Sequence, residues 1–503
     1  MELIQKYKPR KFNESILYKA VNESVNSFYR SIENDGRELP QFVKREFEKY
    51  LACGNPEYGL TRVKCNDNKC KSSVWVPTSC KTRGFCPTCG GRRMNVAAIN
   101  LTEKVLPWVP IRQWVVSVPF PLRFWMASDH KIMKTVNSMI VRIIETYIKE
   151  KAQKRGIRNS HTGAVSFIQR WGGGLNLNPH FHIIFLDGVF QTYNSDEKDP
   201  VFIKSSPIQE SEILDIVENI CREVTLILIK EGFLEYDNDE ISEVFTEKNE
   251  SSQIILDFFK SASVYSQIAL GPRSGKKVRK IGAREFYNID SVAEKIGDCC
   301  GKYGGFSLHA NTSFHTHQRK EMEALIRYVA RSSVSLERLS ETNDGNIKYE
   351  LKSPWSDGTT AVLFSKHEFL EKLASLVPYP HKNLIVYFGC LAPKHKIRSS
   401  IVPDIKKSEL ANEDESNKKI KNNRYICWRE LLKKTWEIDL FTCQECGGST
   451  TIISFVTDPV ELRKIIDHAG LLPKPPPSDD LENKHTIYET VLEELPLQWD
   501  PIA

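Results

Sequence analysis

Apolar residues recur along this chain with two different periods, and the periods predict both helices and strands. In residues 130–155 apolar side chains return every three or four positions, as in an amphipathic helix. Residues 112–120, 163–171 and 180–190 are instead short apolar runs rich in β-branched and aromatic residues, which is typical of buried strands. The last two runs are joined by GGGLNLNP, a connection that favours a hairpin. The chain is therefore expected to be an α+β protein.

Changes in composition divide the chain into five expected regions. They are a helical, cysteine-rich region at 1–104, alternating strands and helices at 105–340, a β-rich extension at 341–403, a charged linker at 404–424, and a C-terminal α/β region at 425–503 with a CxxC pair and a proline-rich tail. The tail is expected to be extended and poorly ordered.

The composition excludes several classes of protein. With 40% hydrophobic and 27% charged residues the chain is expected to be globular rather than disordered. It has no run of 18 apolar residues and no apolar core of a signal peptide near its start, so a cytoplasmic location is expected. In that compartment its 13 cysteines are not expected to form a disulfide framework. The net charge of +6 permits a nucleic-acid partner without requiring one.

Two cysteine pairs near the N-terminus have the spacing of a zinc site. Cys65 and Cys70 form the first pair, and Cys86 and Cys89 the second, 15 residues further on. Two such pairs supply the four tetrahedral thiolates that structural zinc prefers. Cys53 and Cys80 lie close by and are candidates to replace one of these ligands. The alternative is that these cysteines are simply buried apolar residues.

A further cysteine pair, Cys443 and Cys446, has no obvious partner pair. Cys427 and His468 are the candidates to complete it. Because half a site is weak evidence for a metal, binding there is left open.

The motif His180-Phe181-His182 opens a predicted strand. Residues two apart on a strand point to the same face, so the two imidazoles project side by side and could hold one divalent ion. Such a pair is found more often without a metal than with one, so alone it is weak evidence. Gln169, on the preceding strand, and His309 are candidates for a third ligand.

A tyrosine among arginines is the candidate nucleophile. Residues 317–339 have the period of a helix, and Tyr328 lies next to its apolar face between Arg327 and Arg331, which could hold phosphates. A tyrosine that only packs the helix is the alternative. A basic loop between the histidines and this helix is a candidate for contacts with the DNA backbone, although a solvated surface explains it equally well. Its cations are Arg273, Lys276, Lys277, Arg279 and Lys280.

These parts occur in an order that resembles the IS91-type transposases of the HUH endonuclease superfamily. The similarity extends over nearly the whole chain. It is carried by the segments FVKREFEKYLACG, SCKTRGFCPTCGGRRM, LPWVPIRQWVVSVPFPLR, FIQRWGGGLNLNPHFHIIFLDGVF, LGPRSGKKVRKIG, LIRYVARSSVSLERL, KSPWSDGTTAV, LASLVPYPHKNLIVYFG and DLFTCQECGG.

The resemblance implies an N-terminal zinc-binding domain and, at 105–340, an antiparallel-sheet HUH nuclease domain with flanking helices. It implies that His180 and His182 hold Mg²⁺ or Mn²⁺, and that the Tyr328 hydroxyl attacks single-stranded DNA to leave a 5′-phosphotyrosine. The expected function is rolling-circle-like transposition of a bacterial insertion sequence.

The chain departs from part of this family in having one tyrosine on the helix. Some members carry two tyrosines four residues apart, but here the positions four before and four after Tyr328 are Ala324 and Ser332. The resemblance is therefore to the single-tyrosine branch. A second subunit, water or the DNA's 3′-hydroxyl would have to perform the next cleavage, so a homodimer is an open option.

Two rival functions stay open from the sequence. The chain could be a zinc-containing DNA-binding protein that has lost catalysis. It could also be a metal-dependent phosphoesterase that uses water as the nucleophile. The expected partner in the preferred reading is single-stranded DNA at the element ends and at the target.

Overall fold

The structure is a computed structural model of the chain. It describes residues 11–193, 200–237, 240–243, 251–283, 299–403, 429, 432–433 and 439–471. The predicted linker at 404–424 and the proline-rich tail lie outside the described residues. No helix among the described residues is long and apolar enough to cross a membrane.

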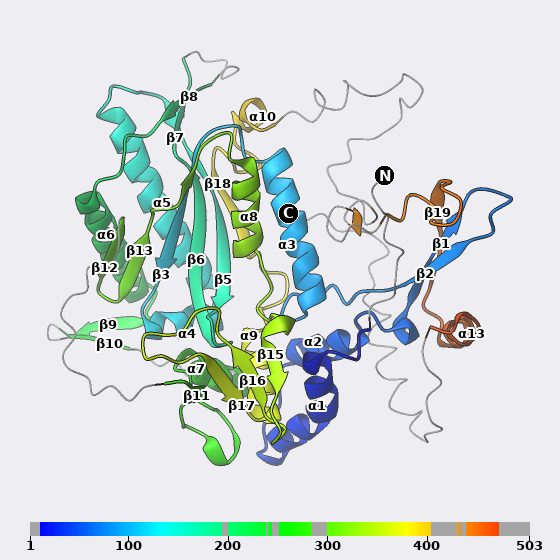
Figure 1. Cartoon of the computed structure of the whole chain (residues 1–503). Helices are drawn as coiled ribbons and strands as arrows, with labels where there is room; N and C mark the ends of the chain where they lie inside the picture. The colour runs from blue at the N-terminus through cyan, green and yellow to red at the C-terminus, as the bar shows by residue number, and fades with distance from the viewer. Residues whose placement is uncertain are drawn as a thin grey trace.

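A seven-stranded antiparallel sheet forms the centre of the fold (Figure 1). Its path is β12-β13-β3-β6-β5-β18, and β14 pairs with β3 beside β13. The strands are β3 (Ile111–Ser117), β5 (Gly163–Trp171), β6 (Leu177–Leu186), β12 (Cys300–Tyr303), β13 (Phe306–His309), β14 (Ser313–Phe314) and β18 (Ile385–Gly389). The predicted hairpin is confirmed as β5 and β6, and the α+β class is confirmed with it.

Helices cover both faces of this sheet because side chains alternate between the faces of each strand. Trp114, Phe181 and Ile183 point to one face and pack on three helices. These are α4 (Phe120–Ser128), α5 (His130–Gln153) and α6 (Glu210–Lys230). Phe167 and Ile184 point to the other face and pack on α3 (Pro87–Lys104) and α8 (Arg319–Val329) (Figure 1). The helix predicted over 130–155 is confirmed as α5.

A second sheet lies below the first in Figure 1 and shares a core with four helices. Its order is β11-β17-β16-β15. The strands are β11 (Arg279–Ile281), β15 (Leu339–Glu341), β16 (Ile347–Glu350) and β17 (Ala361–Phe364). The helices are α1 (Ile16–Asn34), α2 (Gln41–Ala52), α7 (Ser251–Val264) and α9 (Lys366–Leu376).

A third, three-stranded sheet joins distant parts of the chain in the order β19-β1-β2. It contains β1 (Leu60–Cys65), β2 (Ser73–Pro77) and β19 (Thr450–Val456), with η1 (Pro56–Tyr58) and α13 (Pro459–Ala469) beside it. The remaining elements are short. They are β4 (Ser160–His161), β7 (Gly188–Gln191), β8 (Val201–Lys204), β9 (Leu234–Asp237), β10 (Glu240–Glu243), η2 (Gly271–Arg273), η3 (Leu336–Arg338) and α10 (Arg398–Ile401).

The pairing of distant strands corrects the expected division of the chain. Residues 341–403 are not a separate extension, because β18 is an edge strand of the central sheet and β16 and β17 pair with β11 and β15. The C-terminal region is likewise joined to the cysteine-rich region by β19 on β1. Composition alone does not report hydrogen bonds between distant strands, so the expected division does not reveal these pairings.

The helix predicted over 317–339 is shorter in the structure. It ends at Val329, after which Ser332, Ser333 and Ser335 occupy a turn that leads into η3. Serine side chains compete with helical backbone hydrogen bonds, which favours an end here. Tyr328 therefore lies in the last turn of α8, where it is 40% exposed.

Candidate metal and tyrosine site

The two histidines of β6 lie side by side on the face of the central sheet that α8 covers. Nε2 of His180 is 3.2 Å from Nε2 of His182, and both side chains are buried. Phe181 between them points to the opposite face and packs in the core there. An ion bound by two imidazole nitrogens at about 2.1 Å, with an angle of about 90–100°, holds them about 3.0–3.2 Å apart. The pair therefore has the spacing of two ligands of one ion.

Hydrogen bonds on the far sides of the rings orient both imidazoles. Nδ1–H of His180 donates to the carbonyl of Asn178 at 2.7 Å, which leaves the Nε2 lone pair directed at His182. The side-chain amide of Gln113, on β3, lies 2.7 Å from Nδ1 of His182. An amide can present its oxygen at that place by rotation, so Gln113 can accept the Nδ1 proton and leave His182 with its lone pair on Nε2.

Burial keeps both rings neutral. It lowers the pKa of His182 to about 3, with further contributions from His180 and Arg331. Burial is also the main cause of the lowered pKa of His180. A neutral imidazole has the lone pair that metal coordination requires, whereas an imidazolium has none. The electrostatic environment therefore suits metal binding at neutral pH.

Tyr328 faces these histidines from α8. Its ring centroid lies 6.3 Å from that of His182, with the ring planes 89° apart. Two cations lie over its ring: Cζ of Arg331 at 4.5 Å and Nζ of Lys352 at 4.8 Å from the centroid. The site thus brings together a tyrosine hydroxyl, two imidazole nitrogens and two positive charges.

The two candidates for a third ligand differ in position. Gln169, on β5, pairs directly with His180 on β6 and is buried, although its Nε2 donates to the carbonyl of Val329 at 3.3 Å. His309, on β13, is separated from His182 by the whole of β3, since both residues pair with Val115. Two strand spacings place it about 10 Å away. Among the described residues, no third His, Cys, Asp or Glu joins the histidine pair.

Several of the predicted DNA-binding cations have carboxylate partners inside the protein. Arg327 is paired with Glu323 one turn earlier on α8, at 2.6 Å. Arg273 and Arg279 both contact Glu368 on α9, at 2.7 and 3.4 Å. The two pairs with Glu368 hold the loop to α9 and leave less of its charge for a phosphate.

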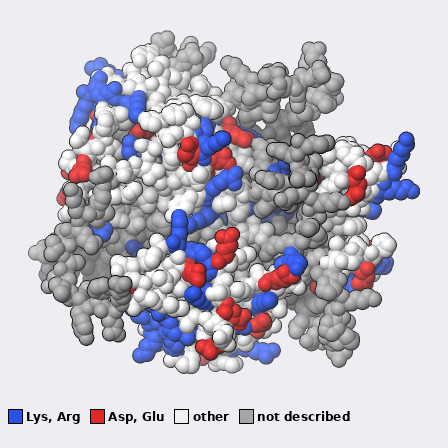
Figure 2. Space-filling model, in the orientation of Figure 1, with Lys and Arg blue, Asp and Glu red and all other residues white. Residues whose placement is uncertain are grey.

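The other cations of that loop lie closer to solvent. Lys280 is paired with Asp357 at 2.6 Å but remains 38% exposed, and Nζ of Lys277 donates to the carbonyl of Tyr265. Lys276 is exposed. On the face drawn in Figure 2, Lys and Arg side chains form a broken band that runs down the middle of the molecule, with acidic groups beside it.

Two hollows have residues of α4 in their lining, Phe120 in one and Arg123 in the other. The smaller, of about 340 Å³, is lined by Ser117, Arg123 and Lys302 among others, and Ser117 pairs with His180 across β3 and β6. The larger, of about 410 Å³, combines aromatic rings with lysines. Its aromatic residues are Phe120, Tyr265 and Trp355, and its lysines are Lys277, Lys280 and Lys372.

The two hollows are linked by stacked side chains. The guanidinium of Arg123 lies 4.2 Å from the ring centroid of Phe120, whose ring stacks on Tyr265 at 6.0 Å. Aromatic faces with nearby cations are what proteins use to bind unpaired bases and their phosphates.

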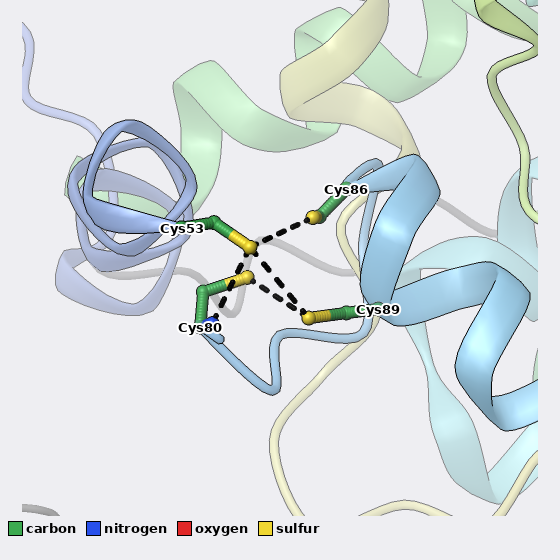
Figure 3. A group of neighbouring side chains, drawn as sticks. All are labelled: Cys53, Cys80, Cys86 and Cys89. Atoms are coloured by element: carbon green, nitrogen blue, oxygen red, sulfur yellow. Dashed lines mark hydrogen bonds between the residues drawn. The ribbon is translucent and has the colours of Figure 1, made fainter. Parts of the chain in front are cut away.

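A cluster of four cysteines lies at the N-terminal end of α3 (Figure 3). Cys53 follows α2, Cys80 lies in the loop after β2, and Cys86 and Cys89 are the N-cap and first turn of α3. Their sulfurs converge, with separations of 3.4 to 3.9 Å between contacting pairs. Four sulfurs at about 2.3 Å from one zinc ion would be about 3.8 Å apart.

The predicted zinc ligand set is corrected by this geometry. Cys86 and Cys89 join Cys53 and Cys80, whereas Cys65 and Cys70 belong to a different cluster with Cys443 and Cys446. The C-terminal pair has Cys65 and Cys70 as its partners. His468, on α13, is not part of this cluster, and Cys427 lies outside the described residues. Spacing identifies cysteine pairs, but the fold decides which pairs meet.

The cluster around Cys86 adjoins the turn that follows Tyr328. A Cβ on Gly90, one residue after Cys89, would lie 2.6 Å from Cβ of Ser332. The hydroxyl of Ser333 also donates to the carbonyl of Gly84, in the loop between Cys80 and Cys86. The cysteine cluster therefore supports the C-terminal end of the helix that carries the tyrosine.

Comparison with known families agrees with this arrangement. Residues 163–399 match a family model described as "Putative transposase", and residues 23–118 match one described as "Transposase zinc-binding domain" of the IS91 type. The first match contains the histidines and Tyr328, and the second contains all four cysteines of Figure 3. Over these two segments the chain is thus similar to transposases, and its N-terminal segment is similar to the zinc-binding domain of the IS91-type transposases. No curated protein and no solved structure matches the chain.

Sequence reasoning missed three residues of the site. Gln113 and Lys352 come from segments far from the histidines, and Trp355 was noted only within a β-rich stretch. A polar residue in the buried strand RQWVVSV was the one available signal for Gln113. Nothing in the sequence marks Lys352 as a neighbour of Tyr328.

Proposed function

We propose that this protein is a transposase that cleaves and joins single-stranded DNA with Tyr328 as its nucleophile. The observation that carries the proposal is the position of Tyr328, whose ring faces the histidine pair while Arg331 and Lys352 lie over it. A tyrosine that only packed its helix would not need two cations and a pair of metal-ligand nitrogens beside it.

His180 and His182 would hold the divalent ion, Mg²⁺ or Mn²⁺. The fit rests on their Nε2 atoms 3.2 Å apart, their neutral rings and the hydrogen bond from Nδ1 of His180 to Asn178. Gln169, opposite His180, is the neighbour best placed to add an oxygen ligand. Such an ion would withdraw charge from the scissile phosphate.

The reaction conserves the energy of the phosphodiester bond. The Tyr328 oxygen forms a bond to phosphorus and loses its proton to solvent, while the bond from phosphorus to the 3′ oxygen breaks and that oxygen takes up a proton. The products are a 5′-phosphotyrosine and a free 3′-hydroxyl. A later attack on the phosphotyrosine by a 3′-hydroxyl rejoins a DNA strand without ATP.

The residues around the tyrosine would position the strand. Arg331 and Lys352 can pair with phosphate oxygens on either side of the scissile bond. The hollows at Arg123 and Phe120 offer a path on which unpaired bases stack and phosphates meet lysines. A duplex would hide its base faces from these rings, so the aromatic path favours a single strand.

One nucleophile per chain limits the order of steps. The positions four residues before and after Tyr328 are Ala324 and Ser332, so α8 offers no second tyrosine there. A second cleavage therefore needs a 3′-hydroxyl, water or the tyrosine of a second subunit. The proposal therefore includes rolling-circle-like transposition of an IS91-like element in which single strands are transferred one at a time.

The test is formation of a covalent adduct. Purified protein is incubated with Mn²⁺ or Mg²⁺ and labelled single-stranded DNA from the ends of its element, and adducts are separated under denaturing conditions. We expect an adduct with wild-type protein and none with Tyr328→Phe, which should still bind the DNA. Tyr193→Phe, at another exposed tyrosine, is the matched control and should form the adduct normally.

Two outcomes would contradict the proposal. An undiminished adduct with Tyr328→Phe would exclude this residue as the nucleophile. Cleavage without any adduct would instead favour water as the nucleophile, as in a metal-dependent phosphoesterase.

A further inference from the structure

The second cysteine cluster lies where the segment around β1 and β2 meets the segment before β19. Cys65 ends β1 and Cys70 follows in the turn before β2, while Cys443 and Cys446 lie in the loop that precedes β19. All four sulfurs lie within 4.8 Å of one another. The C-terminal pair lies outside both family matches.

The distances within this cluster are those of a metal site. Sγ of Cys65 lies 3.4 Å from that of Cys446, and Sγ of Cys70 lies 3.8 Å from that of Cys443. These separations are too long for a disulfide bond, in which the sulfurs are about 2.0 Å apart. They are close to the separation of about 3.8 Å between two sulfurs bound to one tetrahedral zinc ion.

The backbone around the sulfurs forms two similar knuckles. The amide of Asp67 donates to Sγ of Cys65, and the amide of Gly448 donates to Sγ of Cys446, each at 3.4 Å and each from two residues further on. A hydrogen bond to a thiolate favours its charged form, which is the form that binds a metal.

Two glycines form the C-terminal knuckle, where the backbone passes close to the sulfurs. Gly447 has a φ of +75°, which side chains disfavour. A Cβ on Gly448 would lie 3.3 Å from Sγ of Cys446 and 3.6 Å from Sγ of Cys65. The two glycines of CQECGG thus let the backbone approach the sulfurs closely. Four thiols that only happened to lie near one another would not need such a close approach.

Among the described residues, the small sheet around the cluster has only a small apolar core. Its buried apolar residues form two small groups, Leu60 with Leu462 and Ile466, and Val63 with Val76 and Leu440. On β19, Ile453 and Phe455 are 48% and 71% exposed. Modules with so small a core usually depend on a metal or disulfides for their stability.

We propose that Cys65, Cys70, Cys443 and Cys446 bind a second, structural zinc ion that fastens the C-terminal strand β19 to the zinc-binding domain. The two pairs of ligands come from segments 373 or more residues apart in the sequence, so the ion would cross-link the segment around β1 to the segment before β19. The C-terminal CxxC is thereby part of the N-terminal zinc-binding region rather than a separate motif. This inference does not depend on the proposed function of Tyr328.

The first test is the metal content of the full-length protein by native mass spectrometry. We expect two zinc ions per chain in the wild type and one in Cys443→Ser/Cys446→Ser. The matched control is Cys221→Ser/Cys299→Ser, at cysteines outside both clusters, which should keep two. Hydrogen exchange should become faster in β19 of the first variant and stay unchanged in β5. One zinc in the wild type with no loss on substitution, or unchanged exchange in β19, overturns the proposal.

The second test needs no variant, so misfolding cannot obscure it. Cys446 is exposed and a free thiol there would react rapidly with iodoacetamide. In the zinc-bound wild type we expect Cys446 to be protected, and to react once a chelator has removed the metal. Cys299 should react alike in both conditions. Rapid alkylation of Cys446 before chelation, or a Cys65–Cys446 disulfide in peptide maps, would overturn the proposal.

Discussion

The contact between Gly90 and Ser332 gives a sharp test of how the zinc-binding domain supports the tyrosine. Gly90→Ala adds a Cβ that would lie 2.6 Å from Cβ, 2.7 Å from Oγ and 3.2 Å from Cα of Ser332. Rotation of the serine side chain relieves the contact with Oγ but not those with Cβ and Cα. The turn after α8 must therefore move away from α3, and Tyr328 lies only four residues before Ser332.

The neighbouring Gly91 provides a matched control on the same helix. A Cβ there meets nothing within 4 Å. Replacing glycine by alanine within a helix stabilises by about 0.5–1 kcal/mol, and this gain applies at both positions. At Gly90 it is opposed by overpacking, which costs about 1–3 kcal/mol. The free energies of unfolding of the two variants should therefore differ by about 1–3 kcal/mol, with Gly91→Ala the more stable.

The assay has two parts, denaturant unfolding of the zinc-loaded protein and the rate of adduct formation with single-stranded DNA. Gly91→Ala should be at least as stable as the wild type and equally active. Gly90→Ala should lose stability and form the adduct more slowly while it retains its zinc. If Gly90→Ala matched Gly91→Ala in both measurements, the argument that the zinc-binding domain positions the helix of Tyr328 would be refuted.

Three further predictions concern the site and the interior. Gln113→Leu removes the partner of His182 and should weaken Mn²⁺ binding about 10- to 100-fold, measured by calorimetry, and unchanged affinity would contradict its orienting role. Trp355→Ala should weaken binding of single-stranded DNA about tenfold in fluorescence anisotropy, whereas an equal loss for duplex DNA would argue against base stacking. Burial lowers the pKa of Lys260 to about 8, while the unfolded chain keeps this proton until about pH 10.4, so the unfolded state binds more protons between these values and stability rises with pH. The free energy of unfolding of the wild type minus that of Lys260→Met should thus increase by up to about 1.4 kcal/mol per pH unit across that window, and a constant difference would contradict it.

The local features of the site follow from the sequence. The alternation in β6 places His180 and His182 on one face, and the helical period around Tyr328 places it beside an apolar stripe. Both are properties of a single element, determined by the geometry of a strand or a helix. The α+β class and the hairpin of β5 and β6 could be predicted for the same reason.

The tertiary structure decided which distant residues meet. Six cysteines near the N-terminus could be combined in several ways, and only the pairing of β19 with β1 brings Cys443 and Cys446 to Cys65 and Cys70. This leaves Cys53 and Cys80 to complete the cluster at α3.

The electrostatics of the site were also decided by the fold. Arg273 and Arg279 lie in a loop whose sequence suggests several unpaired cations. In the structure, however, the buried Glu368 of α9 pairs with both arginines. Lys352, 24 positions after Tyr328, is instead brought over its ring. Sequence patterns describe a residue's neighbours along one element, whereas packing between elements depends on the summed burial of many side chains. Which charge remains free and which sulfurs converge is therefore settled only when those elements pack together.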